Sequence, residues 1–120
     1  MEEMLPDPSI VDGSDPRLVR VRRFVLTHYR EPIPLARAAQ IARMERTSFS
    51  NYFHQKTGVC FRDWLVAVRV SEAMRLIAAE DLPLRELPAL CGFNNVRALQ
   101  RAFLRVLDAT AIDYKTSIAR

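Results

Sequence analysis

Apolar side chains recur along this chain at intervals of three and four residues, the spacing of α-helices that bury one face. Between positions 16 and 118 this spacing repeats in successive segments, and no segment alternates apolar with polar residues as a half-buried strand does. The pattern predicts an all-α domain of about seven helices. They are expected over residues 16–29, 35–44, 46–56, 61–79, 84–90, 95–105 and 112–118.

Capping residues mark several of the predicted helix ends. Asp15 before Pro16 combines a side chain that accepts backbone N–H groups with a proline at the first helical position, so a helix begins there. This helix should end near Tyr29, because Pro32 follows. Gly58 is expected to close a later helix as the residue just after its last turn.

The predicted helices divide the chain into a leader and one double domain. Residues 1–14 contain two prolines and a glycine and show no apolar period, so they are interpreted as a flexible leader or linker. The domain over residues 15–118 comprises a first subdomain (15–60), a connector helix (61–79) and a second subdomain (80–118).

The connector is the longest predicted helix, and it is apolar on more than one side. Its early apolar positions and its late ones lie on different faces, as in a helix packed between two lobes. Arg69 lies midway along it and is expected to be a structural hydrogen-bond donor at the edge of the core rather than a contact to a binding partner. The aromatic residues Trp64, Phe53, Phe93 and Phe103 are expected in the core.

The two pairs of short helices beside the connector repeat each other. Leu35 aligns with Leu84, 49 positions on, and after the turn Phe53 aligns with Phe103, 50 positions on, so the second turn is one residue longer. Each unit is a helix, a tight turn and a second helix with an apolar i, i+4 pair, which is helix-turn-helix geometry. Both second helices lack acidic residues, as expected of a surface that approaches DNA phosphates.

Charge is distributed unevenly along the chain. The formal net charge is +4, but residues 1–15 contain five acids and no lysine or arginine, so residues 16–120 hold 18 basic and 9 acidic groups. Sixteen of the basic residues are arginines, whose guanidinium groups make bidentate contacts with phosphate and guanine. This excess favours nucleic acid as the partner.

Composition and motifs weigh against several other classes of protein. No apolar run approaches the about 18 residues of a membrane span and no signal-peptide pattern is present, so no membrane association is expected. Cys60 and Cys91 lack metal-ligand spacing and are predicted to be buried free thiols in a reducing cytoplasm. No constellation of His, Cys and Asp supports catalysis, and neither a cofactor nor a metal is expected.

Two stretches resemble the arabinose-regulator (AraC/XylS) family of bacterial transcription factors. DLPLRELPALCGFNNVRALQRAFLRVLDATAIDYK (81–115) is similar to its run of Asp-Leu, amphipathic helix, Gly-Phe-Asn, recognition helix with Phe, and closing Tyr followed by Arg or Lys. MERTSFSNYFHQKTG (44–58) resembles its first recognition helix. The resemblance covers about residues 16–118 and implies two recognition helices that enter successive major grooves. The connector of about 19 residues would span about 28 Å, close to the about 34–36 Å between such grooves.

The resemblance also implies which side chains contact DNA. On the first recognition helix, base edges would be met by Thr47, Ser50 and Asn51, and the backbone by Arg46, Ser48 and His54. On the second, bases would be met by Arg97, Gln100 and Arg101, phosphates by Asn95 and Arg105, and thymine methyls or sugars by Val96 and Ala98. Asn95 has a structural alternative as a helix cap, and Arg105 as a solvated side chain.

Four positions depart from the family pattern, among them Ala111, which stands where the family has a proline before the last helix. Pro88 lies inside a predicted helix, where it removes a backbone donor unless the helix bends. Arg43 occupies the turn position where the family usually has glycine, and Glu45 replaces a serine cap.

The sequence therefore predicts a sequence-specific, double-stranded-DNA-binding transcription regulator, cytoplasmic and nucleoid-associated, and an activator by its resemblance. RNA polymerase is an expected further partner, and oligomerisation is not required. Two other functions remain open: a degenerate module that binds a protein, suggested by Pro88, Val96 and Ala98, and a DNA-repair methyl acceptor, which neither cysteine favours. The chain is either a small regulator in itself or the DNA-binding end of a longer one.

Overall fold

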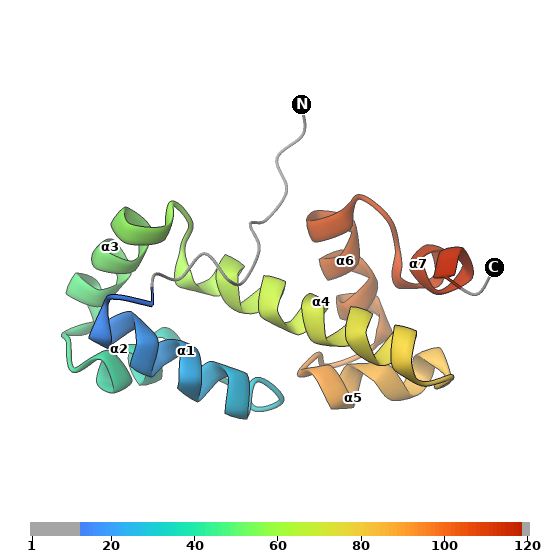
Figure 1. Cartoon of the computed structure of the whole chain (residues 1–120), viewed down its shortest axis with the longest axis horizontal. Helices are drawn as coiled ribbons and strands as arrows, with labels where there is room; N and C mark the ends of the chain where they lie inside the picture. The colour runs from blue at the N-terminus through green and yellow to red at the C-terminus, as the bar shows by residue number, and fades with distance from the viewer. Residues whose placement is uncertain (1–12, 119–120) are drawn as a thin grey trace.

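The computed structural model describes residues 13–118 and contains helices without strands in that range (Figure 1). The elements in chain order are α1 (Pro16–His28), α2 (Leu35–Ala42), α3 (Arg46–Thr57), α4 (Phe61–Ala79), the 3₁₀ turn η2 (Leu84–Glu86), α5 (Leu87–Cys91), α6 (Val96–Leu107) and α7 (Ala111–Ile118). The predicted all-α fold is confirmed. Most of the predicted leader lies outside the described residues.

Two hydrophobic cores lie at opposite ends of α4, which the lobes share. The first lobe (α1–α3 with the first half of α4) buries Leu18, Val21, Val25, Phe49, Phe53, Phe61, Trp64 and Val68. The second lobe (η2 and α5–α7 with the second half of α4) buries Val70, Ala73, Leu87, Cys91, Leu99, Phe103 and Ala111. The broad apolar surface of α4 is thus explained, because each half packs into a different lobe.

Aromatic rings fill the first core. Phe53 lies 5.7 Å from Trp64 and 5.6 Å from Phe61 between ring centroids, and both pairs have edge-to-face geometry. Phe103 is fully buried in the second core, 6.0 Å from the Tyr114 ring. Phe93, also predicted in the core, is half-buried at its edge.

The sequence repeat corresponds to a structural repeat. The span of α2 recurs as η2 and α5 with an offset of 49 residues, and the span of α3 recurs as α6 with an offset of 50. In both units the residue after the first helix is left-handed, with φ of 61° at Arg43 and 91° at Gly92. The next N–H then donates back to an equivalent carbonyl, from Met44 to Ala39 and from Phe93 to Pro88. These bonds close the first helix of each unit.

Two predicted helix bounds are corrected. The helix expected over 35–44 ends at Ala42, because the left-handed Arg43 turns the chain. The continuous helix expected over 84–90 is instead a 3₁₀ turn followed by α5, which begins at Leu87. This break places Pro88 in the first turn of α5, where a missing N–H leaves no helical hydrogen bond unmade.

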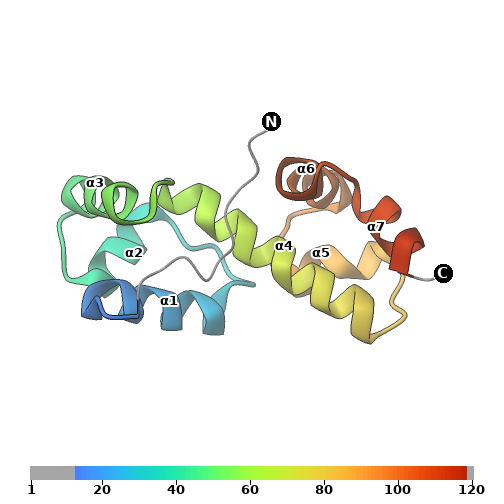
Figure 2. The ribbon, with the colours of Figure 1, turned by 45° about the horizontal axis from the view of Figure 1, so that its top comes forward.

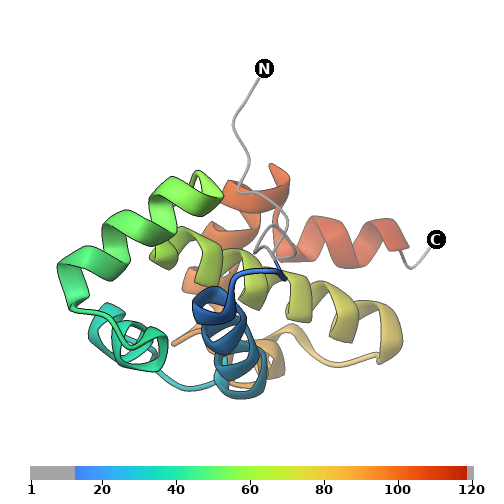
Figure 3. The ribbon, with the colours of Figure 1, turned by 60° about the vertical axis from the view of Figure 1, so that its left-hand side comes forward.

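α3 and α6 lie on the same side of α4, one in each lobe. Figure 1 shows both above the connector, while α1, α2 and α5 lie below it. The turned views in Figures 2 and 3 also show α3 and α6 on one side of α4. The molecule is elongated, with principal extents of 45 × 32 × 24 Å, so the second helices of the two units stand apart along one face.

Candidate nucleic-acid interface

α3 is held by one aromatic face and exposes a polar one. Phe49 and Phe53 are fully buried. The remaining surface of the helix presents side chains without acidic groups. Among the predicted contact residues, the exposed ones are Arg46, Thr47, Ser48, Asn51 and His54, and Ser50 is half-buried.

Glu45 caps the start of α3. Its carboxylate accepts the backbone N–H of Ser48 at 3.0 Å and the Ser48 hydroxyl at 3.3 Å. The backbone N–H groups of Ser48 and then Thr47 hold the pKa of Glu45 below its ordinary value. The carboxylate therefore lies at the positive end of the dipole of its own helix, where a negative charge is stabilising.

α6 is more strongly amphipathic, with Leu99 and Phe103 fully buried. Asn95 is its N-cap, and its Oδ1 accepts the Ala98 N–H at 2.8 Å. The capping alternative for Asn95 is thus confirmed, while its phosphate contact stays a prediction. Around the rest of the helix Arg97, Arg101 and Arg105 are exposed, and Val96 and Ala98 are half-buried.

Two predicted contact residues on α6 have partners within the protein. The Gln100 Oε1 accepts the backbone N–H of Ala111 at 2.7 Å, which ties α6 to the start of α7. The Arg105 guanidinium lies 3.1 Å from the Asp63 carboxylate of α4, and both side chains remain partly exposed. The assignments of Gln100 and Arg105 to DNA stay predictions, and each now has a structural role beside it.

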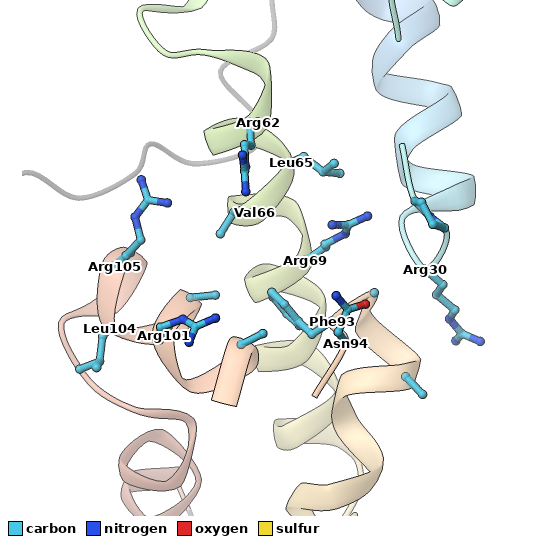
Figure 4. Close-up of a pocket in the computed structure, with 15 residues that line it drawn as sticks. Arg30, Arg62, Leu65, Val66, Arg69, Phe93, Asn94, Arg101, Leu104 and Arg105 are labelled. Atoms are coloured by element: carbon cyan, nitrogen blue, oxygen red, sulfur yellow. The ribbon is translucent and has the colours of Figure 1, made fainter. Parts of the chain in front are cut away.

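A groove of about 1050 Å³ lies between the lobes along α4, and its lining includes no acidic residue. Figure 4 shows Arg62 and Arg69 on α4, and Arg101 and Arg105 on α6, around this hollow. We call it the interlobe groove; its arginines are Arg30, Arg62, Arg69, Arg101 and Arg105. A neighbouring hollow of about 590 Å³ shares Arg62 and Arg69 with the groove and reaches Ser50 of α3.

Sequence reasoning missed Arg62 as part of this surface. It is exposed in the first turn of α4 and lines both hollows. Spacing within α4 does not single it out, because its partners in the groove come from α6, about 40 residues further along the chain. A basic residue at the start of a helix between two candidate recognition helices was the available signal.

The cysteines are only partly as predicted. Cys91 is buried, and burial and then the charge of Glu72 raise its thiol pKa to about 11. Cys60 is exposed, contrary to expectation, because it stands at the turn before α4 rather than within a core-facing helix. Within residues 13–118 no three His, Cys, Asp or Glu residues are arranged to hold a metal ion. Nor does any helix in that range combine the length and apolar character that crossing a bilayer requires.

Known proteins resemble this chain in sequence. A helix-turn-helix domain family matches residues 38–117. The probable transcriptional regulator LumQ of Photobacterium leiognathi is 24% identical over 98 residues, which are 82% of this chain and 40% of LumQ. The transcriptional regulator RipA of Corynebacterium diphtheriae is 29% identical over 86 residues, 72% of this chain and 25% of RipA. The chain therefore spans less than half the length of these curated relatives.

Solved structures share the fold. The DNA-binding domain of the global transcriptional factor AdpA, crystallised with a target DNA, is 31% identical, with a TM-score of 0.79 over 86% of this chain and 92% of that domain. An AraC-type regulator from Chromobacterium violaceum has a TM-score of 0.82 at 18% identity, over 90% of this chain and 96% of that one. Fold, repeat and sequence agree, and the chain belongs to the AraC-type helix-turn-helix family of transcriptional regulator DNA-binding domains.

Proposed function

We propose that this domain binds double-stranded DNA sequence-specifically and reads two successive major grooves with α3 and α6. The observation that carries the proposal is that both helices lie on the same side of α4, each held by an apolar face and free of acids elsewhere (Figure 1). α4 has 19 residues and spans about 28 Å. Grooves one turn apart are separated by about 34–36 Å, so one copy of the domain could reach both.

The polar side chains divide into base readers and backbone contacts. On α3, Asn51 is exposed and has the bidentate amide that suits adenine. On α6, Arg97 and Arg101 suit guanine. The further predicted base contacts are Thr47, Ser50, Gln100, Val96 and Ala98.

Contacts to the DNA backbone would flank these base-contacting side chains. The side chains assigned to phosphates are Arg46, Ser48, His54, Asn95 and Arg105. We add Arg62 to this proposal because it is exposed and lines the interlobe groove. The interlobe groove is lined by residues of α4, α5 and α6 and of the segment after α1, and the neighbouring hollow that shares Arg62 reaches Ser50 of α3. We propose that the strand joining two successive major grooves passes along these two hollows. Apart from Arg69, whose guanidinium donates to two backbone carbonyls, the arginines of the interlobe groove would neutralise the phosphates of that strand, because no acidic residue of the described chain lines the groove.

In the cell the domain would serve transcription regulation, as an activator that contacts RNA polymerase while bound to DNA. The matched regulators are longer than this chain. A sensing or dimerising part of a whole protein would be expected to modify binding by this domain rather than to supply it.

Selection from random duplexes, followed by binding assays with the selected sequence, tests the proposal. Asn51→Ala should weaken binding by about 1–3 kcal/mol and relax preference at one base position. Arg62→Met should weaken all duplexes alike and lower the salt slope by about one phosphate, a change in log–log slope of about 0.9. Arg85→Met is the control, because it removes an exposed arginine of η2 that lies on neither proposed recognition helix and does not line the interlobe groove.

A selection that enriches no sequence, with binding insensitive to salt, would contradict the proposal. It would favour the second candidate, a module that binds a protein. One observation supports that candidate: Leu104 on α6 is 48% exposed and lines the same groove as the arginines. Capture of a purified polymerase subunit that is lost in Leu104→Asp, with no DNA motif, would be its signature.

A further inference from the structure

Arg69 lies on α4 at the boundary between the two cores. Val68 before it belongs to the first core, and Val70 after it belongs to the second. Its Nε donates to the Tyr29 carbonyl at 2.9 Å, and one terminal nitrogen donates to the Glu31 carbonyl at 2.8 Å. Both carbonyls lie just beyond the end of α1, where helical backbone acceptors lack helical partners. The predicted structural role of Arg69 is thus confirmed, and the fork joins α4 to the first lobe.

Gly92 brings the turn of the second lobe against the same point. A Cβ atom on Gly92 would lie 2.2 Å from the Tyr29 carbonyl oxygen and 2.7 Å from the Arg69 Nε. The equivalent residue of the first unit, Arg43, has the same left-handed backbone but an exposed side chain. The repeat therefore needs no glycine for its turn alone. Gly92 is required because here the turn of one lobe rests on the backbone of the other.

Tyr29 makes a second tie through its side chain. Its hydroxyl donates to the Glu72 carboxylate of α4 at 3.0 Å, and Arg75 holds the same carboxylate at 2.9 Å. Tyr29 is itself nearly buried in the first core. The end of α1 is thus fixed on α4 at two successive turns, by a carbonyl and by a hydroxyl.

We propose that Tyr29, Arg69 and Gly92 form an interlobe latch that sets the orientation of α3 relative to α6. Within residues 13–118, no helix of the first lobe packs broadly on a helix of the second apart from the shared α4. The apolar cores therefore fix each lobe on its half of α4. The latch is a direct contact from lobe to lobe, and it opposes bending and twisting of α4 at the boundary.

The consequence for DNA rests on the proposed function. Half of α4 is about 14 Å long, so tilting one lobe by about 15° about its middle moves the far end by about 3.6 Å. The rise of one base pair is about 3.4 Å. A tilt of this size at Arg69 would therefore displace one recognition helix relative to the other by a distance comparable to the base-pair rise. The latch would thus select the spacing between the two sites on DNA.

Distances between spin labels test the latch without DNA. In a Cys60→Ser background the labels are attached through Gln55→Cys on α3 and Thr116→Cys on α7, both exposed positions. We expect a narrow distance distribution in this parent and at least a twofold broader one after Arg69→Met or Gly92→Ala, with helical circular dichroism retained.

Two control substitutions isolate the latch from other effects. Gly58→Ala places a side chain at φ +84°, where no atom lies within 4 Å, so it matches the backbone strain of Gly92→Ala without the collision. Arg85→Met removes an exposed arginine outside the latch. Both controls should leave the distribution narrow. Equal widths in the latch variants and the controls would overturn the proposal.

Spacing-variant duplexes test the consequence. The parent should bind the selected duplex at least tenfold more tightly than the same duplex with one base pair inserted between its two halves. Arg69→Met and Gly92→Ala should reduce that ratio to about threefold or less, while Gly58→Ala and Arg85→Met keep it. A latch variant that retains the full ratio would refute a spacing role. A protein that binds no duplex would refute the proposed function, while the label distances would still decide the latch.

Discussion

Asp15 joins the start of α1 to the recognition helix α3, and its replacement gives a sharp test of the first lobe. Its Oδ1 accepts the backbone N–H of Arg17 at 3.0 Å and of Leu18 at 3.4 Å, as an N-cap does. Its other oxygen accepts the Tyr52 hydroxyl from α3. The single carboxylate thus closes a helix end and fixes a side chain of the helix proposed to read DNA.

The expected cost of Asp15→Ala follows from these contacts. Loss of an N-cap costs about 1 kcal/mol, and loss of a negative charge at a helix N-terminus costs about 0.5 kcal/mol more. The free energy of unfolding should therefore fall by about 1.5 kcal/mol, which lowers the midpoint temperature by about 6–8 °C in a domain of this size. Asp15→Asn keeps a good cap without the charge and should lose only about 0.5 kcal/mol.

The pH dependence of the loss of stability in Asp15→Ala would identify the Asp15 carboxylate as its cause. Partial burial acts to raise the pKa of Asp15, but the hydrogen bonds from Tyr52, Leu18 and Arg17 outweigh it and hold the pKa below its ordinary value. A lowered folded-state pKa means that the stabilisation is present above the unfolded-state pKa, about 3.9. It is then lost as the pH falls through the folded-state value. The difference between wild type and Asp15→Ala should thus shrink in acid.

Urea denaturation followed by Trp64 fluorescence is the suitable assay. Trp64 is the chain's single tryptophan and is fully buried in the first core. Its fluorescence therefore reports the unfolding of the first lobe, which contains the helix that Asp15 caps. Measurements at pH 7 and near pH 3 give the difference between the variants at each pH. A pH-independent loss, or equal losses in Asp15→Ala and Asp15→Asn, would refute the assignment to a charged cap.

Three further outcomes are expected. Asn95→Ala removes the cap on the Ala98 N–H and should cost about 1 kcal/mol in urea denaturation; an unchanged midpoint would show that the cap is dispensable. Phe103→Ala, at a fully buried site, should cost about 3–5 kcal/mol by circular dichroism, and a loss below 1 kcal/mol would contradict tight packing there. A thiol reagent at pH 8 should modify Cys60 quickly and Cys91 only on unfolding, because Cys91 is buried with a pKa of about 11; rapid modification of both in the folded protein would contradict this.

Local signals along the chain were sufficient for most of the helix bounds. Asp15-Pro16 and Gly58 act within a few residues, and the structure has a helix beginning and another ending at those positions. The effect of Pro88 on the helix is harder to predict from the sequence. The sequence shows that Pro88 lacks a backbone N–H donor, but it does not distinguish a bend in one helix from a 3₁₀ turn followed by a new helix. That choice depends on how Leu87 and Cys91 reach the second core.

The sequence by itself determined the class of fold, the repeat and the residues on the outer faces of α3 and α6, because helical periodicity and capping are encoded in neighbouring positions. Tertiary structure alone decided what distant segments do together. Arg62 lines the interlobe groove together with arginines of α6, Gln100 accepts the backbone N–H of Ala111, and Gly92 packs against the Tyr29 carbonyl. These contacts join residues between 11 and 63 positions apart, and their geometry follows from how two cores pack on one helix.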